Sequence, residues 1–289
     1  MSGTEATASD GVMLRPMTEA DLEAALVLTT EVRWPHRASD WECAFRHGHG
    51  LIAERDGQVV GTGLRWRWGE RHATIGMVIV AQSCQGRRIG HRLMSALLEG
   101  LDSHSVLLHA TAEGRGLYER LGFVRIGELR QHQGTALPSP PVALDAGWRL
   151  RPAGQRDLET LVALDEQARG MPRGALIAEL LAQADATVVL DHDGRARGFA
   201  MLRRFGRGHA IGPVVAPEAT GAKALIAHLS GQNAGRFTRI DIDFDSGLGE
   251  WIESLGLLRV DAPATMLRGP ALANTQGTRL FAIVTQALG

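Results

Sequence analysis

Apolar runs in the first half of the chain have the lengths and spacing of buried strands. Residues 51–55 and 58–68 are two such runs, and Asp56-Gly57 between them predicts a tight hairpin turn. Residues 73–80 form a third run, rich in β-branched side chains and short enough for a buried strand. The pattern predicts at least three consecutive strands.

The neighbouring segments add helices to these strands. A strand at 13–16 leads into a helix whose start is marked by Thr18 and Asp21, a variant of the capping box. Residues 31–50 show no clear period and are interpreted as irregular. The remaining elements are helices at 90–101 and 116–121 and strands at 106–110 and 123–129. The expected fold class is therefore α/β (α+β), a mixed central sheet flanked by helices.

The same series occurs twice along the chain. Leu14-Arg15-Pro16 returns as Leu150-Arg151-Pro152, and Asp21-Leu22-Glu23 returns as Asp157-Leu158-Glu159. The Asp56-Gly57 turn is matched by Asp193-Gly194 at nearly the same offset. Because these matches keep their order, we predict two tandem copies of one fold. The predicted division is a disordered N-terminus at 1–12, domains at 13–134 and 148–289, and a proline-containing linker at 135–147.

Composition excludes several functional classes. The chain has 289 residues, 44% of them hydrophobic and 22% charged, with a net charge of −1. This balance gives no reason to expect nucleic-acid binding. No run is long enough for a membrane helix, and the start lacks the apolar stretch of a signal peptide. Cys43 and Cys84 make neither a disulfide framework nor a zinc site, so no metal and a cytoplasmic location are expected.

One loop carries candidate chemistry. The strand ending at Val78-Ile79-Val80 is followed by a loop with two glycines and two arginines, and then by a helix. Free backbone N–H groups and the positive end of the helix dipole make such a place an anion site. The alternative is an ordinary strand-to-helix turn with a solvated basic edge.

The loop resembles the phosphate-binding motif of the GNAT family of N-acetyltransferases, Gln/Arg-x-x-Gly-x-Gly/Ala. Gln85 and Gly90 fit the motif, and Arg88 replaces its middle glycine. We therefore expect either that position 88 does not need a positive φ or that the loop sits differently. The resemblance implies an acetyl-CoA site whose residues are Val78, Ile79, Val80, Gln85, Gly86, Arg87, Arg88, Ile89, Gly90, His91 and, less directly, Thr111, which stands where the family often has asparagine.

A second motif lies downstream at the family's spacing. Leu117-Tyr118-Glu119 and Gly122-Phe123 resemble the family's Leu-Tyr-Glu-x-x-Gly-Phe, and Tyr118 is the only tyrosine of the chain. The resemblance implies that Tyr118 protonates the departing coenzyme A thiolate, which a phenol within hydrogen-bond reach can do. The alternative is a tyrosine that packs a short helix.

The second copy lacks both motifs. Its corresponding loop, 216–223, is shorter and has no arginine, and Ile252 stands where Tyr118 stood. We predict a degenerate domain that takes no part in acyl transfer. Residues 241–247 alternate acidic and apolar side chains, which favours a strand with one solvated face over a calcium loop, although carboxylates facing a cationic acceptor stay an option.

The amine side has no single marker. His109, at the end of a predicted strand, is our candidate general base; Glu31, His36, Asp40 and His72 are alternatives. Trp34, His36, Trp41 and Trp66 are candidate acceptor contacts, with core packing equally open for the tryptophans.

The leading hypothesis is an acetyl-CoA-dependent N-acetyltransferase that acts on a small-molecule amine by direct transfer. A non-catalytic acyl-CoA sensor and a protein N-acetyltransferase stay open, as does a homodimer.

Overall fold

The computed structural model describes residues 11–272 and 277–289. Most of the predicted disordered N-terminus lies outside these residues, and the first strand begins at Val12. The chain forms two compact units. One comprises Met1–Trp66, described from Gly11 on, together with Ile75–Asp102; the other comprises Arg67–Thr74 and Ser103–Gly289. Because of this division, each unit is described separately.

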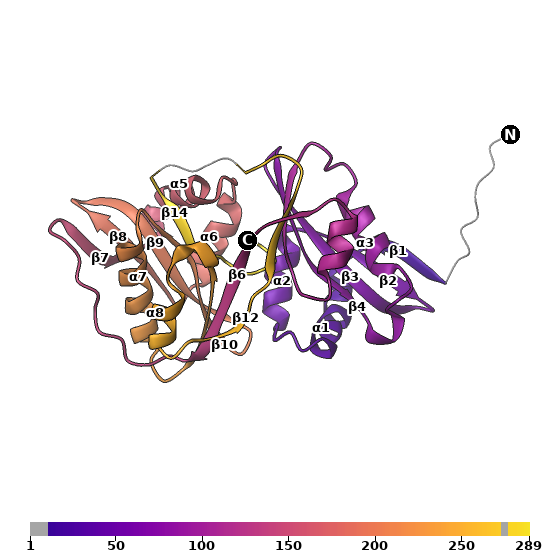
Figure 1. Cartoon of the computed structure of the whole chain (residues 1–289), viewed down its shortest axis with the longest axis horizontal. Coiled ribbons are helices and arrows are strands. Elements are labelled where there is room, and N and C mark those ends of the chain that lie inside the picture. The colour runs from indigo at the N-terminus through magenta and orange to yellow at the C-terminus, as the bar shows by residue number, and fades with distance from the viewer. Residues whose placement is uncertain (1–10, 273–276) are drawn as a thin grey trace. The chain divides into compact units, whose positions relative to one another are not determined.

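The first unit is an antiparallel sheet with three helices, drawn in indigo and purple in Figure 1. Its strands follow the order β1-β2-β3-β4. They are β1 (Val12–Pro16), β2 (His49–Arg55), β3 (Gln58–Trp68) and β4 (His72–Val80), of which β3 and β4 cross into the second unit. The helices are α1 (Leu22–Glu31), α2 (Ala38–His47) and α3 (Ile89–Leu98). Helix α2 occupies half of the stretch 31–50 that was predicted to be irregular, so that prediction was wrong.

Two glycines on β3 let helix α3 approach the sheet closely. A Cβ atom added at Gly63 would lie 2.7 Å from Cδ1 of Leu97, and one at Gly61 would lie 3.1 Å from Cδ1 of Leu93. Leu93 and Leu97 are fully buried. Each buried leucine stabilises the unit by about 2 kcal/mol, so α3 is held firmly against β3.

The second unit contains a longer mixed sheet. Its strand order is β5-β13-β6-β11-β14-β10-β9-β8-β7, with β12 beside β6. The strands are β5 (Ser105–Ala110), β6 (Val124–Thr135), β7 (Trp148–Pro152), β8 (Ala186–His192), β9 (Arg195–Phe205), β10 (Gly208–Ala216), β11 (Phe237–Asp243), β12 (Leu258–Asp261), β13 (Ala264–Arg268) and β14 (Arg279–Ala282). The helices are α4 (Arg115–Arg120), α5 (Leu158–Arg169), α6 (Gly174–Gln183), α7 (Ala219–Gln232) and α8 (Gly249–Ser254).

Strands are exchanged between the two halves of the sequence within this unit. Strand β13 lies between β5 and β6, antiparallel to both, so that Thr265 is opposite His109 on one side and Gly127 on the other. The later part of β6 pairs in turn with β11 and β12. A strand from the second half therefore completes the sheet that β5 and β6 begin, which the sequence did not predict.

The repeat is visible as identical local contacts. Arg15 forms an ion pair with Asp21 at 2.7 Å, and Arg151 forms one with Asp157 at the same distance. In each copy the aspartate also accepts a hydrogen bond from the backbone N–H three residues before it. The Leu-Arg-Pro and Asp-Leu-Glu repeats thus form the same local contact in both copies, in which an arginine on the first strand fixes the start of the first helix. The two tandem copies and the α/β class are confirmed.

Candidate functional site

The end of β4 carries a backbone irregularity at Met77. Its φ is +54, which is unusual for a non-glycine residue inside a strand and is typical of a β-bulge. The Met77 carbonyl accepts a hydrogen bond from the Thr62 hydroxyl at 2.9 Å, which holds the distorted peptide in place. Beyond it the predicted coenzyme contacts alternate: Ile79 is buried, whereas Val78 and Val80 are half-buried. The strand thus presents one partly open side just before the loop.

The loop after β4 has the left-handed backbone that the glycine-rich motif requires. Gly86 has φ +78, and Arg88 has φ +60 and ψ 13. The expectation that position 88 does not need a positive φ was therefore wrong: the arginine adopts the conformation of the glycine it replaces. The Gln85 side chain donates a hydrogen bond to the Val80 carbonyl at 3.3 Å and ties the loop to the strand.

Helix α3 begins with an uncapped and open end. No side chain caps it, and its first turn has no acidic residue. Gln85, Gly86, Arg87 and Arg88 are exposed, whereas Ile89 is buried and anchors the first turn. A Cβ added at Gly86 would meet nothing within 4 Å, so space is open above the loop. The N–H groups of a first turn that no side chain caps, two arginines and this open space fit a pyrophosphate.

Tyr118 lies on α4 in the second unit and is held by local packing. Its ring makes an edge contact with Phe123 at 6.1 Å between centroids, and Cε2 would lie 3.0 Å from a Cβ added at Gly114. Gly114 therefore leaves room for the ring. Burial raises the pKa of Tyr118 to about 12, so the phenol keeps its proton at neutral pH and is available as a proton donor.

Thr111 serves the turn that leads into α4. Its hydroxyl accepts a hydrogen bond from the Gly114 N–H at 3.3 Å, and its carbonyl accepts one from the Arg115 N–H. These bonds explain why a short polar residue stands here. The predicted coenzyme contact at Thr111 stays a prediction.

His109 is a half-buried residue on β5. Its Nδ1 lies 3.2 Å from the Thr265 hydroxyl on β13, and its Nε2 is buried without a hydrogen-bond partner among the described residues. Burial, and to a lesser degree the positive charge of Arg169, lowers the pKa of His109 to about 3. Such a ring is neutral at physiological pH and is a weak base, which disfavours the predicted role as general base.

The four candidate acceptor contacts separate into two kinds. Trp41 and Trp66 are fully buried, and their indole N–H groups donate to the Thr29 hydroxyl and the Ala44 carbonyl. Both are core residues of the first unit, so they pack in the core, as the alternative interpretation had it, and do not face an acceptor. Trp34 and His36 are half-buried, with ring centroids 6.0 Å apart. These two remain candidates for contact with a ligand.

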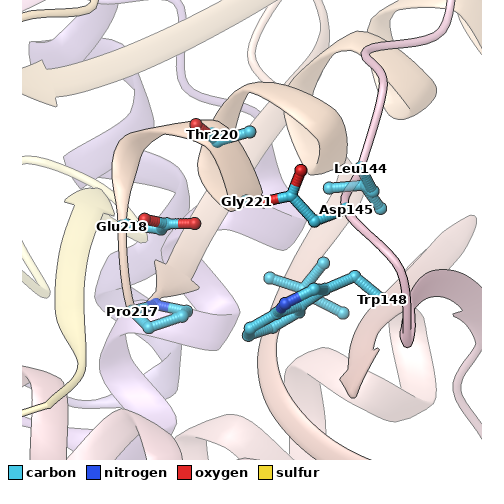
Figure 2. A pocket seen from close by; sticks show the side chains of 8 residues that line it. Leu144, Asp145, Trp148, Pro217, Glu218, Thr220 and Gly221 are labelled. Carbon is cyan, nitrogen blue, oxygen red and sulfur yellow. The ribbon is translucent and has the colours of Figure 1, made fainter. Parts of the chain in front are cut away.

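The loop of the second copy borders a small pocket. Figure 2 shows this pocket at the start of α7, lined by Leu144 and Asp145, by Trp148 at the start of β7, and by Pro217, Glu218, Thr220 and Gly221. The two carboxylates of Asp145 and Glu218 stand where a phosphate site would need positive charge. Ile252 in place of a tyrosine is fully buried. That this copy lacks a coenzyme site stays a prediction.

The acidic strand of the second half is interior. Asp241 on β11 is buried and pairs with Arg239 at 2.7 Å, and Asp243 accepts a hydrogen bond from the Asp245 N–H. Strand β11 has neighbours on both edges and buried residues on both faces. The interpretation of residues 241–247 as a strand with one solvated face was therefore wrong.

By its fold, the chain is a tandem repeat of a mixed α/β unit, and in each copy a distorted strand leads to a helix that no side chain caps. Comparison with known proteins identifies this unit. Two models described as acetyltransferase (GNAT) domain match residues 35–137 and 161–282, which together make up most of the chain. The chain belongs to the GNAT acetyltransferase family as a tandem protein.

Individual relatives agree with this assignment. The uncharacterized N-acetyltransferase YitH of Bacillus subtilis is 29% identical over 222 residues, covering 76% of this chain and 77% of that protein. A solved structure from Pyrococcus horikoshii superposes with a TM-score of 0.78 at 20% identity, covering 100% of this chain and 99% of its own. A tandem GNAT protein from the clavulanic acid biosynthesis pathway superposes with a TM-score of 0.66 at 15% identity, covering 90% and 99%. The two structures support the fold.

No helix within residues 11–272 and 277–289 is both long enough and apolar enough to cross a membrane.

Proposed function

We propose that this chain is an acetyl-CoA-dependent N-acetyltransferase that transfers the acetyl group directly to a small-molecule amine. The observation that carries the proposal is the open start of α3, where Gly86 and Arg88 keep the left-handed backbone of a phosphate-binding loop. The matching loop of the second copy is lined by Asp145 and Glu218 instead. The coenzyme therefore belongs to the first copy.

Different residues bind the coenzyme and transfer the proton. The N–H groups at the start of α3, with Arg87 and Arg88, hold the pyrophosphate, and the backbone around Val78 polarises the thioester carbonyl. The bound coenzyme supplies an activated acyl group. As the amine nitrogen forms its bond to the carbonyl carbon and the carbon–sulfur bond breaks, Tyr118 gives its phenolic proton to the sulfur. The proton released by the new amide returns to the phenolate through solvent, which balances the reaction.

The amine must react in its neutral form. A His109 with a pKa of about 3 has little capacity to remove a proton from an ammonium group, so we assign it no role as general base. The enzyme instead binds the fraction of the amine that is already neutral in solution. As a result, kcat/KM should rise with pH up to the pKa of the free amine, without a break near the ordinary pKa of histidine.

A small-molecule acceptor is the class we favour. The tandem relative from the clavulanic acid pathway belongs to the biosynthesis of a small molecule, and it shares the architecture over 90% of this chain.

The test is calorimetry with acetyl-CoA, followed by a thiol-release assay over small amines and lysine- or N-terminus-bearing peptides. We expect binding at micromolar coenzyme and turnover of small amines. The absence of binding at millimolar coenzyme would reject the proposal. Binding without thiol release from any amine would favour the sensor, and turnover of peptides alone would favour a protein N-acetyltransferase.

A further inference from the structure

Strands β10 and β11 of the second copy pair directly with each other near their starts and are then separated by β14. The direct pairing is parallel and comprises His209 and Ala210 of β10. Beyond it, the pairing of β10 with β9 is irregular between Ile211 and Val214. From Val214 on, β14 lies between β10 and β11, antiparallel to both. A segment from the end of the chain therefore fills the space between two diverging strands.

Strand β14 pairs with the residues that match the predicted coenzyme contacts. Residues 75–80 of the first copy correspond to residues 211–216 of the second at a constant offset, so Val78-Ile79-Val80 matches Val214-Val215-Ala216. Opposite these last three residues lie Ala282, Leu280 and Arg279 of β14. In the first copy, by contrast, β4 and β5 are direct neighbours in the strand order. The backbone that we propose to face the thioester in the first copy thus corresponds to backbone that pairs with a peptide strand in the second.

The inserted segment is buried and is bonded to its surroundings through its backbone. Residues 281–284 are each at most 4% exposed. The Ile283 N–H donates to the Asp241 carbonyl of β11 at 3.0 Å. Arg203 of β9, itself buried, donates to the Gly212 carbonyl at 2.7 Å and to the Val284 carbonyl at 2.6 Å. One guanidinium therefore joins β10 to the inserted segment.

Gly212 of β10 leaves room for this segment. A Cβ atom added at Gly212 would collide with the Ile283 carbonyl oxygen. Both partners of this contact belong to the backbone, so no side-chain rotation relieves the collision. Glycine at this position therefore permits the close approach of the two backbones.

We propose that the space between β10 and β11 is a binding site for an extended apolar peptide, which residues 279–284 occupy, and that this strand closes the second copy to the thioester-bearing arm of acyl-CoA. Backbone hydrogen bonds and buried side chains together are the means by which a strand is bound at a sheet edge. The peptide site rests on the contacts above. The excluded ligand rests on the proposed function, because that function places the thioester beside Val78.

The first test removes the strand and returns it as a peptide. A chain without residues 278–289 is titrated with a labelled synthetic peptide of those residues, and anisotropy and thermal unfolding are followed. We expect one peptide per chain and a melting temperature restored toward that of the full chain, whereas the peptide with Phe281→Asp should not bind, because residue 281 is buried. A truncated chain that melts like the full chain and binds no peptide would overturn the site.

Competition identifies the ligand that the strand excludes. S-acetylpantetheine, which carries the thioester arm without the nucleotide, should displace the labelled peptide from the truncated chain. Adenosine 3′,5′-bisphosphate, which lacks the arm, is the matched control and should not displace it. A peptide that millimolar S-acetylpantetheine leaves bound would overturn the substitution of strand for acyl arm.

Full-length variants give an answer even if the truncated chain does not fold. Hydrogen exchange should show the amides of residues 281–284 protected in the wild type. In Arg203→Met and Gly212→Ala they should exchange about tenfold faster or more, because each change weakens the hold on this segment. Arg195→Met, at an exposed arginine of β9, and Gly154→Ala, where an added Cβ meets nothing within 4 Å, are the matched controls. Unprotected amides in the wild type would refute the inference.

Adding acetyl-CoA to the wild type separates this inference from the proposed function. We expect the coenzyme to slow exchange at residues 85–90 and to leave residues 214–216 unchanged. Slower exchange at both places would overturn the closure of the second copy while supporting the acetyltransferase. No effect at either place would count against the acetyltransferase, and the peptide titration would still decide the peptide site.

Discussion

Replacing Arg88 by glycine should stabilise the protein while weakening its hold on the coenzyme. Arg88 occupies the N-cap position of α3 with φ +60, where a side chain costs about 1–2 kcal/mol relative to glycine. Glycine loses about 0.5–1 kcal/mol through the extra freedom of the unfolded chain. The arginine side chain is exposed, so its removal forfeits little packing. The net gain in the free energy of unfolding should be about 0.5–1 kcal/mol.

Coenzyme affinity should change in the opposite direction. An exposed guanidinium beside a phosphate is worth about 0.5–1 kcal/mol, so the Kd for acetyl-CoA should rise by about two- to fivefold. The loss should shrink at high salt, because salt screens exposed charges.

Two matched variants separate the backbone from the charge. Arg88→Ala removes the charge and keeps the strained backbone, so it should weaken binding without adding stability. Arg87→Gly removes the neighbouring charge at a residue outside the left-handed region, so it should weaken binding and also lower stability. Thermal or urea unfolding measures stability, and calorimetry at two salt concentrations measures Kd. Equal stability for Arg88→Gly and Arg88→Ala would refute the strain reasoning, and an unchanged Kd in both would refute the phosphate contact.

Three other outcomes follow from the structure. Tyr118→Phe should lower kcat by about a hundredfold while the Kd for acetyl-CoA stays constant, since it removes only the proton donor; an unchanged kcat in a single-turnover assay would remove Tyr118 from that role. The pKa of His109 is about 3 in the folded protein and about 6.5 in the unfolded chain, so the unfolded chain takes up the proton first as pH falls. The free energy of unfolding should therefore be unaffected by His109 above about pH 6.5 and should decrease as pH falls toward 3. The decrease amounts to about 2 kcal/mol at pH 5, which urea titrations should show in wild type but not in His109→Gln. A chain ending at Gly147 lacks β13 and should aggregate on size-exclusion chromatography, and co-expression of residues 148–289 should restore a soluble species; a monodisperse, coenzyme-binding fragment would contradict the need for β13.

Local signals in the sequence predicted the local structure well. The Asp-Gly turns, the strand at 73–80 and the helix after the loop are each encoded within a few residues, and all are present. The repeat was also readable, because Arg15 and Asp21 must recur together wherever this strand-to-helix contact forms. The segment 31–50 was misread although α2 is amphipathic, because its apolar residues, such as the buried Trp41 and Ala44, are few among polar and charged ones.

Burial and backbone strain were harder to predict. Trp41 and Trp66 are aromatic residues of the kind that often line ligand pockets. Whether an indole faces a core or a pocket depends on residues distant in the sequence, such as Thr29 for Trp41 and Ala44 for Trp66. The left-handed Arg88 was missed for a related reason. Propensity disfavours that conformation, and the surrounding loop imposes it.

The exchange of β13 could not be read from either copy alone, and it changes how the second copy is understood. Comparing the sequences of the two copies shows only what the second copy lacks, namely the arginines of the loop and the tyrosine. In the structure, Met266 and Leu267 of the same half are buried between β5 and β6, and Thr265 fixes the imidazole of His109. These contributions need backbone pairing and small or apolar side chains, none of which depends on binding a coenzyme. A copy without a phosphate site can therefore still complete the sheet that carries His109 and precedes Tyr118. On this basis, substitutions in the second copy's own loop should leave activity intact, whereas Thr265 and its neighbours on β13 should affect it.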